Sequence, residues 1–532
     1  MEPVRLSTSE RAVAPSPPRP RYRVGRLVGG LYAAALAVWA AFAVFLATYN
    51  LELYPTTWFD EGSHLHVPKT LVQHGVYADL SSEGYRHFGP TTGLGPTVTL
   101  PVALAFKVAG IGLLQARAVM VAYLLAALAL ITEAARRLFG LPTALLASLL
   151  VLTAPGVDVL YLGRQALGEI PALAFFALGV LLWWRSLETP RGGASLALAS
   201  LAFGLAALTK NQLGLMLVLT FAVTLLVDRL HHRQLRPRHS LAPLLTVVGV
   251  VGLAYLAFSL LVVGAQDAVG VLALQREASA GATLVFAPRR MLSSLKFLAS
   301  PDAYAYWAAP GLLYAMVLAR ERSLAGLRVS LLTVFVVVGL AWYAFFSIGW
   351  PRYASAPLAV AGILVAKMLH DLLSLLWRAG DVAGNSAAGA SRARAIAVLL
   401  AVVLSVAYPL QEQARAVVTA SDRSPQLVAA YLDANVSPSE VIETWEPELG
   451  FLTDHRYHYP PSGWLDRSVR ATWLGADHLV DGYDPIAEAR PSHVVVGRFG
   501  KYTGIYSQVL ANAHLRLLTS IGEYDVYEVR YR

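Results

Sequence analysis

The sequence has 532 residues, of which 56% are hydrophobic and 14% are charged, and its mean hydropathy is +0.52. This apolar content exceeds that of an ordinary soluble domain and indicates that most of the chain lies in a membrane. The sequence contains no cysteine, which excludes disulfides, thiolate metal sites and thiol nucleophiles.

The net charge of +9 is distributed unevenly along the chain. Residues 411–532 hold 11 Lys+Arg and 16 Asp+Glu, which leaves 32 of the 43 bases and 18 of the 34 acids in residues 1–410. A basic chain can indicate nucleic acid as a partner, but these bases lie in short loops between apolar stretches. Membrane topology explains them better, and we expect no nucleic-acid partner.

The chain begins with a polar, basic segment. Residues 1–26 contain six arginines and several prolines, which predicts a disordered cytosolic tail. The apolar stretch from Arg26 to Tyr49 is long enough to cross about 30 Å of hydrocarbon. No short apolar segment with a small-residue cleavage site precedes it, so we predict an uncleaved first transmembrane helix.

Ten further apolar stretches give about eleven transmembrane helices, which predicts an α-helical polytopic membrane protein over residues 27–410. They lie near residues 116–132, 141–158, 169–184, 194–209, 212–227, 241–264, 304–319, 329–346, 351–376 and 395–410. Arginine clusters fall in alternate loops, as expected for cytoplasmic loops. This alternation requires the apolar segment 96–112, which contains Lys107 and two prolines, to return to the outer face without crossing. The pattern predicts a multi-pass plasma-membrane protein with a cytosolic N-terminus.

Residues 411–532 are predicted to form a small extracytoplasmic α/β domain, because helical and strand-like patterns alternate there. The expected helices cover residues 425–434 and 502–513, and the expected strands cover 441–444, 493–497 and 524–529. The Ala/Gly-rich stretch from Ala379 to Ala393 is predicted to be a flexible cytosolic linker.

Two neighbouring carboxylates, Asp60 and Glu61, follow the first predicted helix by about ten residues. A carboxylate at this boundary can act as a general base. The alternative is that Asp60 caps a short helix lying at the membrane interface.

Six short segments have the order and the predicted membrane placement of a known family's motifs. They are Phe59-Asp60-Glu61-Gly62, Gln115-Ala116-Arg117, Arg136-Arg137-Leu138-Phe139-Gly140, Arg164 with Glu169-Ile170-Pro171-Ala172, Leu208-Thr209-Lys210, and Trp350-Pro351-Arg352-Tyr353. In these segments the chain resembles the GT-C membrane glycosyltransferases, in particular the bacterial group related to protein O-mannosyltransferases and to the lipid A aminoarabinose transferase.

The resemblance implies an inverting hexosyl- or pentosyltransferase of the cell envelope. Its donor would be a polyprenyl-phosphate-linked sugar, and its acceptor a glycan, a lipid or a protein on the extracytoplasmic face. By the same resemblance Asp60 is the general base, and Glu61 is a second catalytic candidate. The Lys-Pro-Pro-Leu or His-Pro-Pro run that these relatives carry in the first loop is reduced here to Gly95-Pro96-Thr97. The resemblance therefore gives no support for a donor or metal contact from that run.

Arg164 and Glu169 lie five residues apart in a turn predicted to face outward. Glu169 could be a further carboxylate of the site, with Arg164 contacting the donor phosphate. The alternative is that Glu169 stabilises a helix N-terminus and forms a surface ion pair.

Several other residues on the same face are candidates for binding the phosphate of a lipid carrier. Lys210 lies between two apolar spans at the level of a phosphate headgroup, although snorkelling to the interface would also explain it. Arg289 and Arg290 belong to a long outer loop that could close over the donor. Arg352 and Tyr353 enter a helix from outside, where a guanidinium can hold phosphate through its fork of donors. A boundary anchor is the alternative there.

The first outer loop is rich in histidine. It contains His64, His66, His74 and His87. With a neighbouring carboxylate, His64 and His66 are weak candidates for binding a divalent cation, and solvated loop histidines are the alternative. No other cofactor is expected.

Two other functions remain open from the sequence. A secondary transporter would place charged residues near mid-membrane and often shows inverted repeats, but here the charges cluster at span ends and no repeat is evident. A non-catalytic membrane protein with an outer α/β domain is the second alternative. The Trp-Trp-Asp-Tyr-Gly run of oligosaccharyltransferases is absent.

Overall fold

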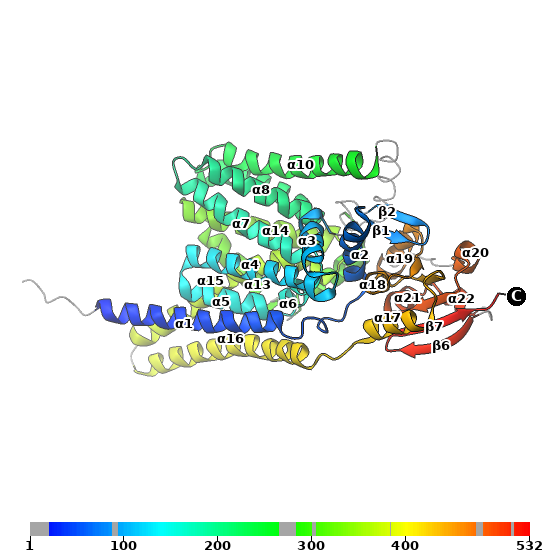
Figure 1. The fold of residues 1–532 in the computed structure, drawn as a ribbon. Coiled ribbons are helices and arrows are strands. Elements are labelled where there is room, and N and C mark those ends of the chain that lie inside the picture. Colours follow the sequence, from blue (N-terminus) through cyan, green and yellow to red (C-terminus); the bar gives the residue numbers. More distant parts are fainter. Residues whose placement is uncertain are drawn as a thin grey trace, which may run out of the picture.

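The structure is a computed structural model that describes residues 21–87, 94–264, 284–300, 305–382, 385–474, 482–511 and 515–531. Most of it is a bundle of helices, and a small sheet domain lies at one end of the bundle (Figure 1). The helical membrane domain and the C-terminal α/β domain expected from the sequence are thereby confirmed.

Each of the eleven apolar stretches predicted as spans contains a helix. Within the described residues, eight helices are long and apolar enough to cross a membrane. They contain α1 (Arg21–Thr48), α4 (Leu113–Phe139), α7 (Glu169–Glu188), α9 (Asn211–Val227), α10 (Arg238–Phe258), α14 (Leu324–Phe346), α15 (Ser355–Val382) and α16 (Asn385–Thr419). Three predicted spans correspond to shorter apolar helices, α5 (Leu141–Thr153), α8 (Gly193–Thr209) and α13 (Ala305–Leu318). The number of crossings therefore stays a prediction.

Three predicted boundaries differ from the structure. α1 begins at Arg21, so the last six residues assigned to the N-terminal tail are helical, and residues 1–20 lie outside the described part. The flexible linker predicted at residues 379–393 is wrong, because α15 extends to Val382 and α16 begins at Asn385. Alanine has the highest helix propensity, so an Ala-rich stretch between two helices extends them readily. α16 also continues past residue 410 to Thr419.

The apolar segment expected to return without crossing forms α3 (Pro96–Ala109). Its 14 residues span about 21 Å, which is less than the thickness of the hydrocarbon core. It begins beside Thr209, where Thr97 Oγ1 lies 2.6 Å from Thr209 Oγ1. It ends just before α4, whose Arg117 contacts the loop that follows α1. Since both contacts are at the end of the bundle that carries the sheet domain, α3 starts and finishes on one side.

The opposite end of the bundle collects the basic loops. Arg328 Nη2 lies 2.5 Å from Glu188 Oε1, which joins the start of α14 to the end of α7. His231 Nε2 lies 2.8 Å from the carbonyl oxygen of Arg320, which joins the loop after α9 to the loop after α13. This arrangement matches the alternation of arginine clusters in the sequence.

The C-terminal domain contains a five-stranded sheet with the strand order β4-β3-β5-β7-β6. Its strands are β3 (Val441–Thr444), β4 (Arg456–His458), β5 (His493–Val496), β6 (Leu515–Ile521) and β7 (Tyr524–Val529). β3 pairs in parallel with β4 and β5, whereas β7 runs antiparallel to β5 and β6. The predicted strands β3, β5 and β7 and the helix α17 (Ser424–Asn435) are confirmed. The helix predicted over residues 502–513 is, up to residue 511, α21 (Arg498–Thr503) followed by α22 (Ser507–Ala511), and residues 512 and 513 lie outside the described part.

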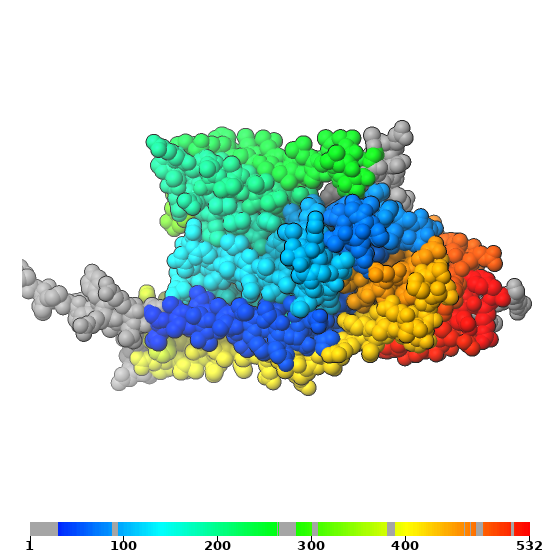
Figure 2. Space-filling model, viewed as in Figure 1, coloured from blue at the N-terminus to red at the C-terminus, as the bar shows by residue number. Residues whose placement is uncertain are grey.

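The first outer loop packs against this domain through the helix α2 (Phe59–His74), which contacts α18 (Pro447–Leu452). Lys69 Nζ donates to the carbonyl oxygens of Gly450, Phe451 and Thr453 at 2.5–3.0 Å. The hairpin of β1 (Ala78–Ser81) and β2 (Gly84–His87) also lies against the domain. In Figure 2 this blue loop lies directly against the orange part of the C-terminal domain. α2 is therefore held between the bundle and the sheet domain.

Candidate functional site

Four charged side chains from separate parts of the chain meet at the end of the bundle next to the C-terminal domain. They are Asp60, Glu169, Lys210 and Arg352, named here the Asp60 cluster. Arg352 Nη1 donates to Asp60 Oδ2, and Arg352 Nε lies 3.8 Å from Glu169 Oε1. Lys210 Nζ lies 3.1 Å from the same Glu169 oxygen. Two of the predicted catalytic acids and two of the predicted phosphate-binding cations are thus brought together.

Helix ends position the members of this cluster. Asp60 is in the first turn of α2 and Glu169 is the first residue of α7, where an acid suits the positive end of the helix dipole. Lys210 is an extended residue between α8 and α9. A Cβ on Gly168 would lie 2.9 Å from Lys210 Cδ, so the absence of a side chain there lets the lysine reach Glu169. Arg352 lies in the short 3-10 turn η4 (Pro351–Ala354) before α15.

The cluster is largely buried and its charges balance. The side chains of Glu169 and Lys210 are 5% and 8% exposed, whereas those of Asp60 and Arg352 are 18% and 14% exposed. Among the described residues, Arg352 Nε donates no hydrogen bond, whereas Glu169 Oε1 has the Lys210 ammonium as its partner at 3.1 Å. Buried polar atoms usually have hydrogen-bond partners. The cluster therefore has unused hydrogen-bonding capacity, as a site for a polar ligand requires.

Aromatic rings surround the guanidinium of Arg352. Its Cζ lies 4.6 Å from the ring centroid of Trp350, 5.5 Å from that of Tyr353 and 5.8 Å from that of Trp58. Such contacts stabilise a cation and limit its orientations. Sequence reasoning named Arg352 and Tyr353 but gave Trp58 and Trp350 no role, because only the fold brings the first loop beside η4.

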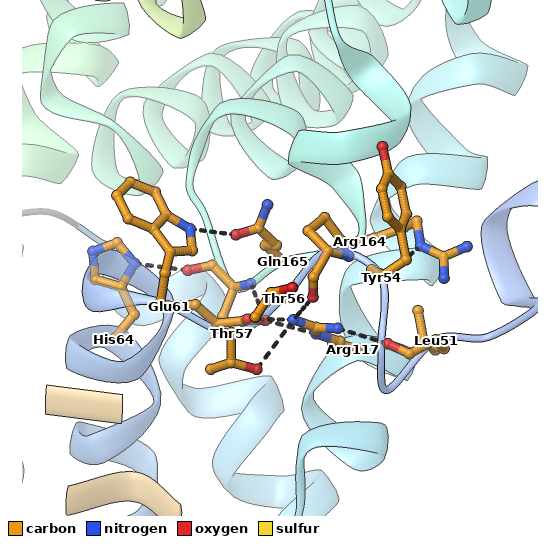
Figure 3. Close-up of polar contacts among 12 residues, drawn as sticks. Leu51, Tyr54, Thr56, Thr57, Glu61, His64, Arg117, Arg164 and Gln165 are labelled. Carbon is orange, nitrogen blue, oxygen red and sulfur yellow. Dashed lines mark hydrogen bonds and ion pairs between the residues drawn. The ribbon is translucent and has the colours of Figure 1, made fainter. Parts of the chain in front are cut away.

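Glu61, predicted as a second catalytic carboxylate, does not face the cluster. Its side chain is fully buried and binds Arg117, with Nε at 2.9 Å from Oε1 and Nη2 at 2.5 Å from Oε2. Arg117 also donates to the carbonyl oxygens of Leu51 and Pro55, both at 2.7 Å. Figure 3 shows the Arg117 guanidinium between Glu61 and Leu51. This pair fastens α2 and the preceding loop to α4, so the Glu61 carboxylate has a structural partner, and its catalytic role stays a prediction.

Arg164, which was predicted to contact the donor phosphate, binds backbone oxygens instead. It is fully buried and donates to the backbone carbonyl oxygens of Leu46, Tyr49 and Tyr54. The first two carbonyls lie in the last turn of α1 and just after it, where the helix leaves acceptors unpaired. Arg164 therefore caps α1, since its nitrogen atoms are occupied by backbone oxygens.

The two predicted arginines of the long outer loop, Arg289 and Arg290, lie on α12 (Pro288–Leu298). One of them is occupied by backbone oxygens, and the other is exposed. Arg290 Nε donates to the carbonyl oxygen of Trp473, and its Nη2 lies 3.4 Å from that of Thr472. Arg290 thus joins α12 to α19 (Ser462–Leu474) of the C-terminal domain. Arg289 is exposed and stays a candidate for binding the donor.

The two histidines considered for a metal face different surroundings. His64 lies one helical turn after Asp60, and its Nδ1 is 2.7 Å from the carbonyl oxygen of Ala166. Burial lowers the pKa of His64 to about 4, so the ring is neutral at pH 7 and Nδ1 carries the hydrogen. His66 packs near Tyr459 of the C-terminal domain. Within the described residues, no group of three or more His, Cys, Asp or Glu side chains could hold a metal ion.

Comparisons with known proteins agree with this architecture. The model of the dolichyl-phosphate-mannose-protein mannosyltransferase family matches residues 94–260, whereas no curated protein matches the chain. The fold is similar to that of ArnT from Cupriavidus metallidurans bound to undecaprenyl phosphate, with a TM-score of 0.59 and 15% identity over 94% of this chain and 98% of that one. It is also similar to the archaeal oligosaccharyltransferase AglB from Archaeoglobus fulgidus in complex with an inhibitory peptide and a dolichol-phosphate, with a TM-score of 0.57 and 14% identity over 94% of this chain and 74% of that one.

These matches bear on the six sequence segments described above. The family model covers four of them completely, and both structural matches extend over the bundle and the C-terminal domain. The resemblance is therefore confirmed: the chain has the fold of the GT-C membrane glycosyltransferases related to protein mannosyltransferases and to ArnT.

Proposed function

We propose that the chain transfers a sugar from a polyprenyl-phosphate-linked donor to an acceptor hydroxyl, with Asp60 as the general base. The observation that carries this proposal is the Asp60 cluster at the end of a membrane bundle, in which the partly exposed Asp60 pairs with Arg352, and Lys210 pairs with Glu169. Similar folds hold undecaprenyl phosphate in ArnT and a dolichol-phosphate in AglB. The fold favours this function over a secondary transporter or a non-catalytic membrane protein.

The proposed reaction is a single displacement. The acceptor oxygen attacks the anomeric carbon while Asp60 takes its proton, and the bond from that carbon to the phosphate oxygen breaks. The electron pair of this bond leaves with the polyprenyl phosphate, and the configuration at the anomeric carbon inverts. Arg352 and Lys210 stabilise the charge that develops on the leaving phosphate.

The donor would change the partner of Arg352. Without donor, Arg352 binds Asp60, which keeps both charges paired. A phosphate that binds the guanidinium in place of Asp60 would free the carboxylate to accept a proton. The two acids and two bases of the cluster are balanced, so a donor phosphate with a single negative charge fits better than a diphosphate.

The proposed site lies on the extracytoplasmic face, with the N-terminus in the cytosol. This orientation rests on the arginine clusters at the opposite end of the bundle, because basic loops favour the cytoplasmic side. Glycans, lipids and protein side chains all remain candidate acceptors.

The substitution Asp60→Asn tests this function. We expect transfer to fall by a factor of about 100 or more, because the amide cannot accept the proton. The assay would measure sugar transfer from undecaprenyl-phosphate-linked sugars to envelope acceptors in washed membranes. Asp433→Asn, on the surface of the C-terminal domain, is the matched control and should keep full activity.

Membrane insertion and binding of undecaprenyl phosphate should persist in Asp60→Asn. Transfer at the unchanged rate in this variant would exclude Asp60 as the base. Failure of the unsubstituted protein to bind undecaprenyl phosphate would contradict the proposed donor class.

A further inference from the structure

A cavity of about 250 Å³ adjoins the Asp60 cluster. Its lining residues come from the connection between α5 and α6 (Val159–Gly163), from α12 and from η4, and they are Pro155, Gly156, Asp158, Phe297, Pro351 and Arg352. Arg352 belongs to both the cavity and the cluster. A group attached to a phosphate at Arg352 would therefore meet this cavity directly.

Asp158 is the only acid among these lining residues, and the backbone holds it in place. It has φ 50° and ψ 37°, in the left-handed region that non-glycine residues seldom adopt and that Asp tolerates better than most. Its N–H donates to the carbonyl oxygen of Ala154 at 3.1 Å, and its own carbonyl oxygen accepts from the N–H of Leu162 at 3.0 Å. These bonds fix the backbone of Asp158 at the wall of the cavity, and with it the position from which the side chain extends.

The carboxyl group of Asp158 has unused hydrogen-bonding capacity. Within the described part of the chain, no side chain or backbone N–H donates to it and no cation pairs with it. In its neutral form a carboxyl both donates and accepts hydrogen bonds, which is the pattern that a sugar hydroxyl complements.

The other walls of the cavity suit the remaining surface of a sugar. Phe297 offers an aromatic ring for the apolar C–H face of a pyranose or furanose, and the two prolines add apolar surface. The volume lies below the roughly 300–1,000 Å³ of pockets for drug-sized ligands. A single ring therefore fits better than an oligosaccharide.

We propose that this cavity binds the sugar ring of the donor, with Asp158 hydrogen-bonded to ring hydroxyls and Phe297 packed against the ring face. The inference rests on the proposed function, because the phosphate at Arg352 is what places the sugar at the cavity. A neutral hexose or pentose is the expected class, since the Asp60 cluster balances its own charges. Asp158 is then a residue that determines sugar specificity.

Binding measurements on the full-length protein in nanodiscs test this inference. The probes are undecaprenyl phosphate and undecaprenyl-phosphate-linked mannose, glucose and galactose, of which glucose differs from each of the others at one hydroxyl. We expect one sugar-bearing lipid to bind the unsubstituted protein at least about tenfold more tightly than undecaprenyl phosphate. Asp158→Leu should remove that difference, and Asp158→Asn should reduce it.

Both Asp158 variants should bind undecaprenyl phosphate with unchanged affinity, which also reports that they are folded. Glu52→Gln, an exposed acid of the first outer loop, is the control and should keep the preference for the sugar. If undecaprenyl phosphate binds but the sugar adds no affinity, or if Asp158→Leu keeps the preference, the sugar site is overturned and the proposed function stands. If undecaprenyl phosphate itself does not bind, the proposed function fails and the sugar site fails with it.

Discussion

At the residue scale, the adjacent acids Asp60 and Glu61 have opposite surroundings. Glu61 is fully buried against Arg117, whereas Asp60 keeps 18% of its side chain exposed beside Arg352. Consecutive residues of a helix point about 100° apart, so one can face the bundle while the other faces a site. The sequence presents two equivalent acids, and only the helix orientation distinguishes them.

Glu61→Gln should destabilise the protein, because it leaves the Arg117 guanidinium buried without its counter-charge. Removing one partner of a buried ion pair costs about 3–5 kcal/mol. The measurement is thermal unfolding in detergent, followed by size-exclusion chromatography. The double variant Glu61→Leu with Arg117→Met is the control and should recover stability. A Glu61→Gln protein of normal stability that has lost transfer would instead make Glu61 a catalytic residue.

A second buried acid should make stability depend on pH. Glu448 is buried in the C-terminal domain, and its Oε1 accepts from the Tyr524 hydroxyl at 2.7 Å. Burial raises the pKa of Glu448 to about 7, above the usual value near 4.3 of an unfolded chain. The folded state therefore retains a proton that the unfolded state releases, and this contribution to stability is complete below pH 4 and lost as the pH rises through 7.

Glu448→Gln should weaken this pH dependence, because the neutral amide still accepts from Tyr524 and Glu446, whose pKa burial also raises, is left to titrate. We expect the variant to exceed the unsubstituted protein in stability by about 1–3 kcal/mol at pH 8 and to match it at pH 5. The unfolding midpoints of both proteins at the two pH values measure the effect. An equal difference at pH 5 and pH 8 would exclude titration of Glu448 as its cause.

At the element scale, the junction of α2 with α18 connects the C-terminal domain to the site. A Cβ on Gly62 would lie 2.2 Å from the backbone nitrogen of Glu448, so the two helices approach at a position that tolerates no side chain. Phe59, which precedes Asp60, stacks on Phe499 with ring centroids 3.8 Å apart. The C-terminal domain thus supports the helix that carries the proposed base.

Gly62→Ala should force α2 away from α18 and move Asp60 relative to Arg352. We expect a loss of about 1–3 kcal/mol from overpacking, together with a clear loss of transfer. Gly249→Ala in α10 is the matched control, because a Cβ there meets no atom within 4 Å. The control should leave activity unchanged. If Gly62→Ala instead has normal stability and normal transfer, the junction of α2 with α18 does not position Asp60. Unfolding midpoints and the transfer assay measure both effects.

Secondary structure was predictable where a pattern was long or strongly periodic. β3, β5 and β7 and the helix α17 follow from hydrophobic runs bounded by turn residues. β4 was not predicted, because a strand of three residues is too short to show a hydrophobic periodicity. It exists because it pairs in parallel with β3, and such non-local pairing has no local signal.

At the scale of the whole molecule, the bundle has two chemically different ends. The basic loops gather at one end, and the Asp60 cluster and the C-terminal domain gather at the other. This arrangement supports the proposed orientation, in which the cluster lies on the extracytoplasmic side, because basic loops favour the cytoplasmic side.

Single cysteines test this orientation, because the chain has none of its own. Ser507→Cys on the C-terminal domain and Arg322→Cys between α13 and α14 are both exposed positions. An impermeant maleimide should label Ser507→Cys in intact cells and Arg322→Cys only after permeabilisation. The reverse pattern would place the Asp60 cluster on the cytosolic side and contradict the proposed orientation.

The sequence by itself determined the membrane-embedded class, the positions of the apolar helices and the presence of an α/β domain. It could do so because hydrophobicity, helix length and arginine placement can each be read from a short stretch of sequence. The tertiary structure alone decided which charged residues meet. Asp60, Glu169, Lys210 and Arg352 are far apart in sequence, whereas Glu61 and Arg164 are occupied by partners that only the folded chain supplies. Those contacts depend on how helices pack and which way each side chain points, and no local pattern encodes either.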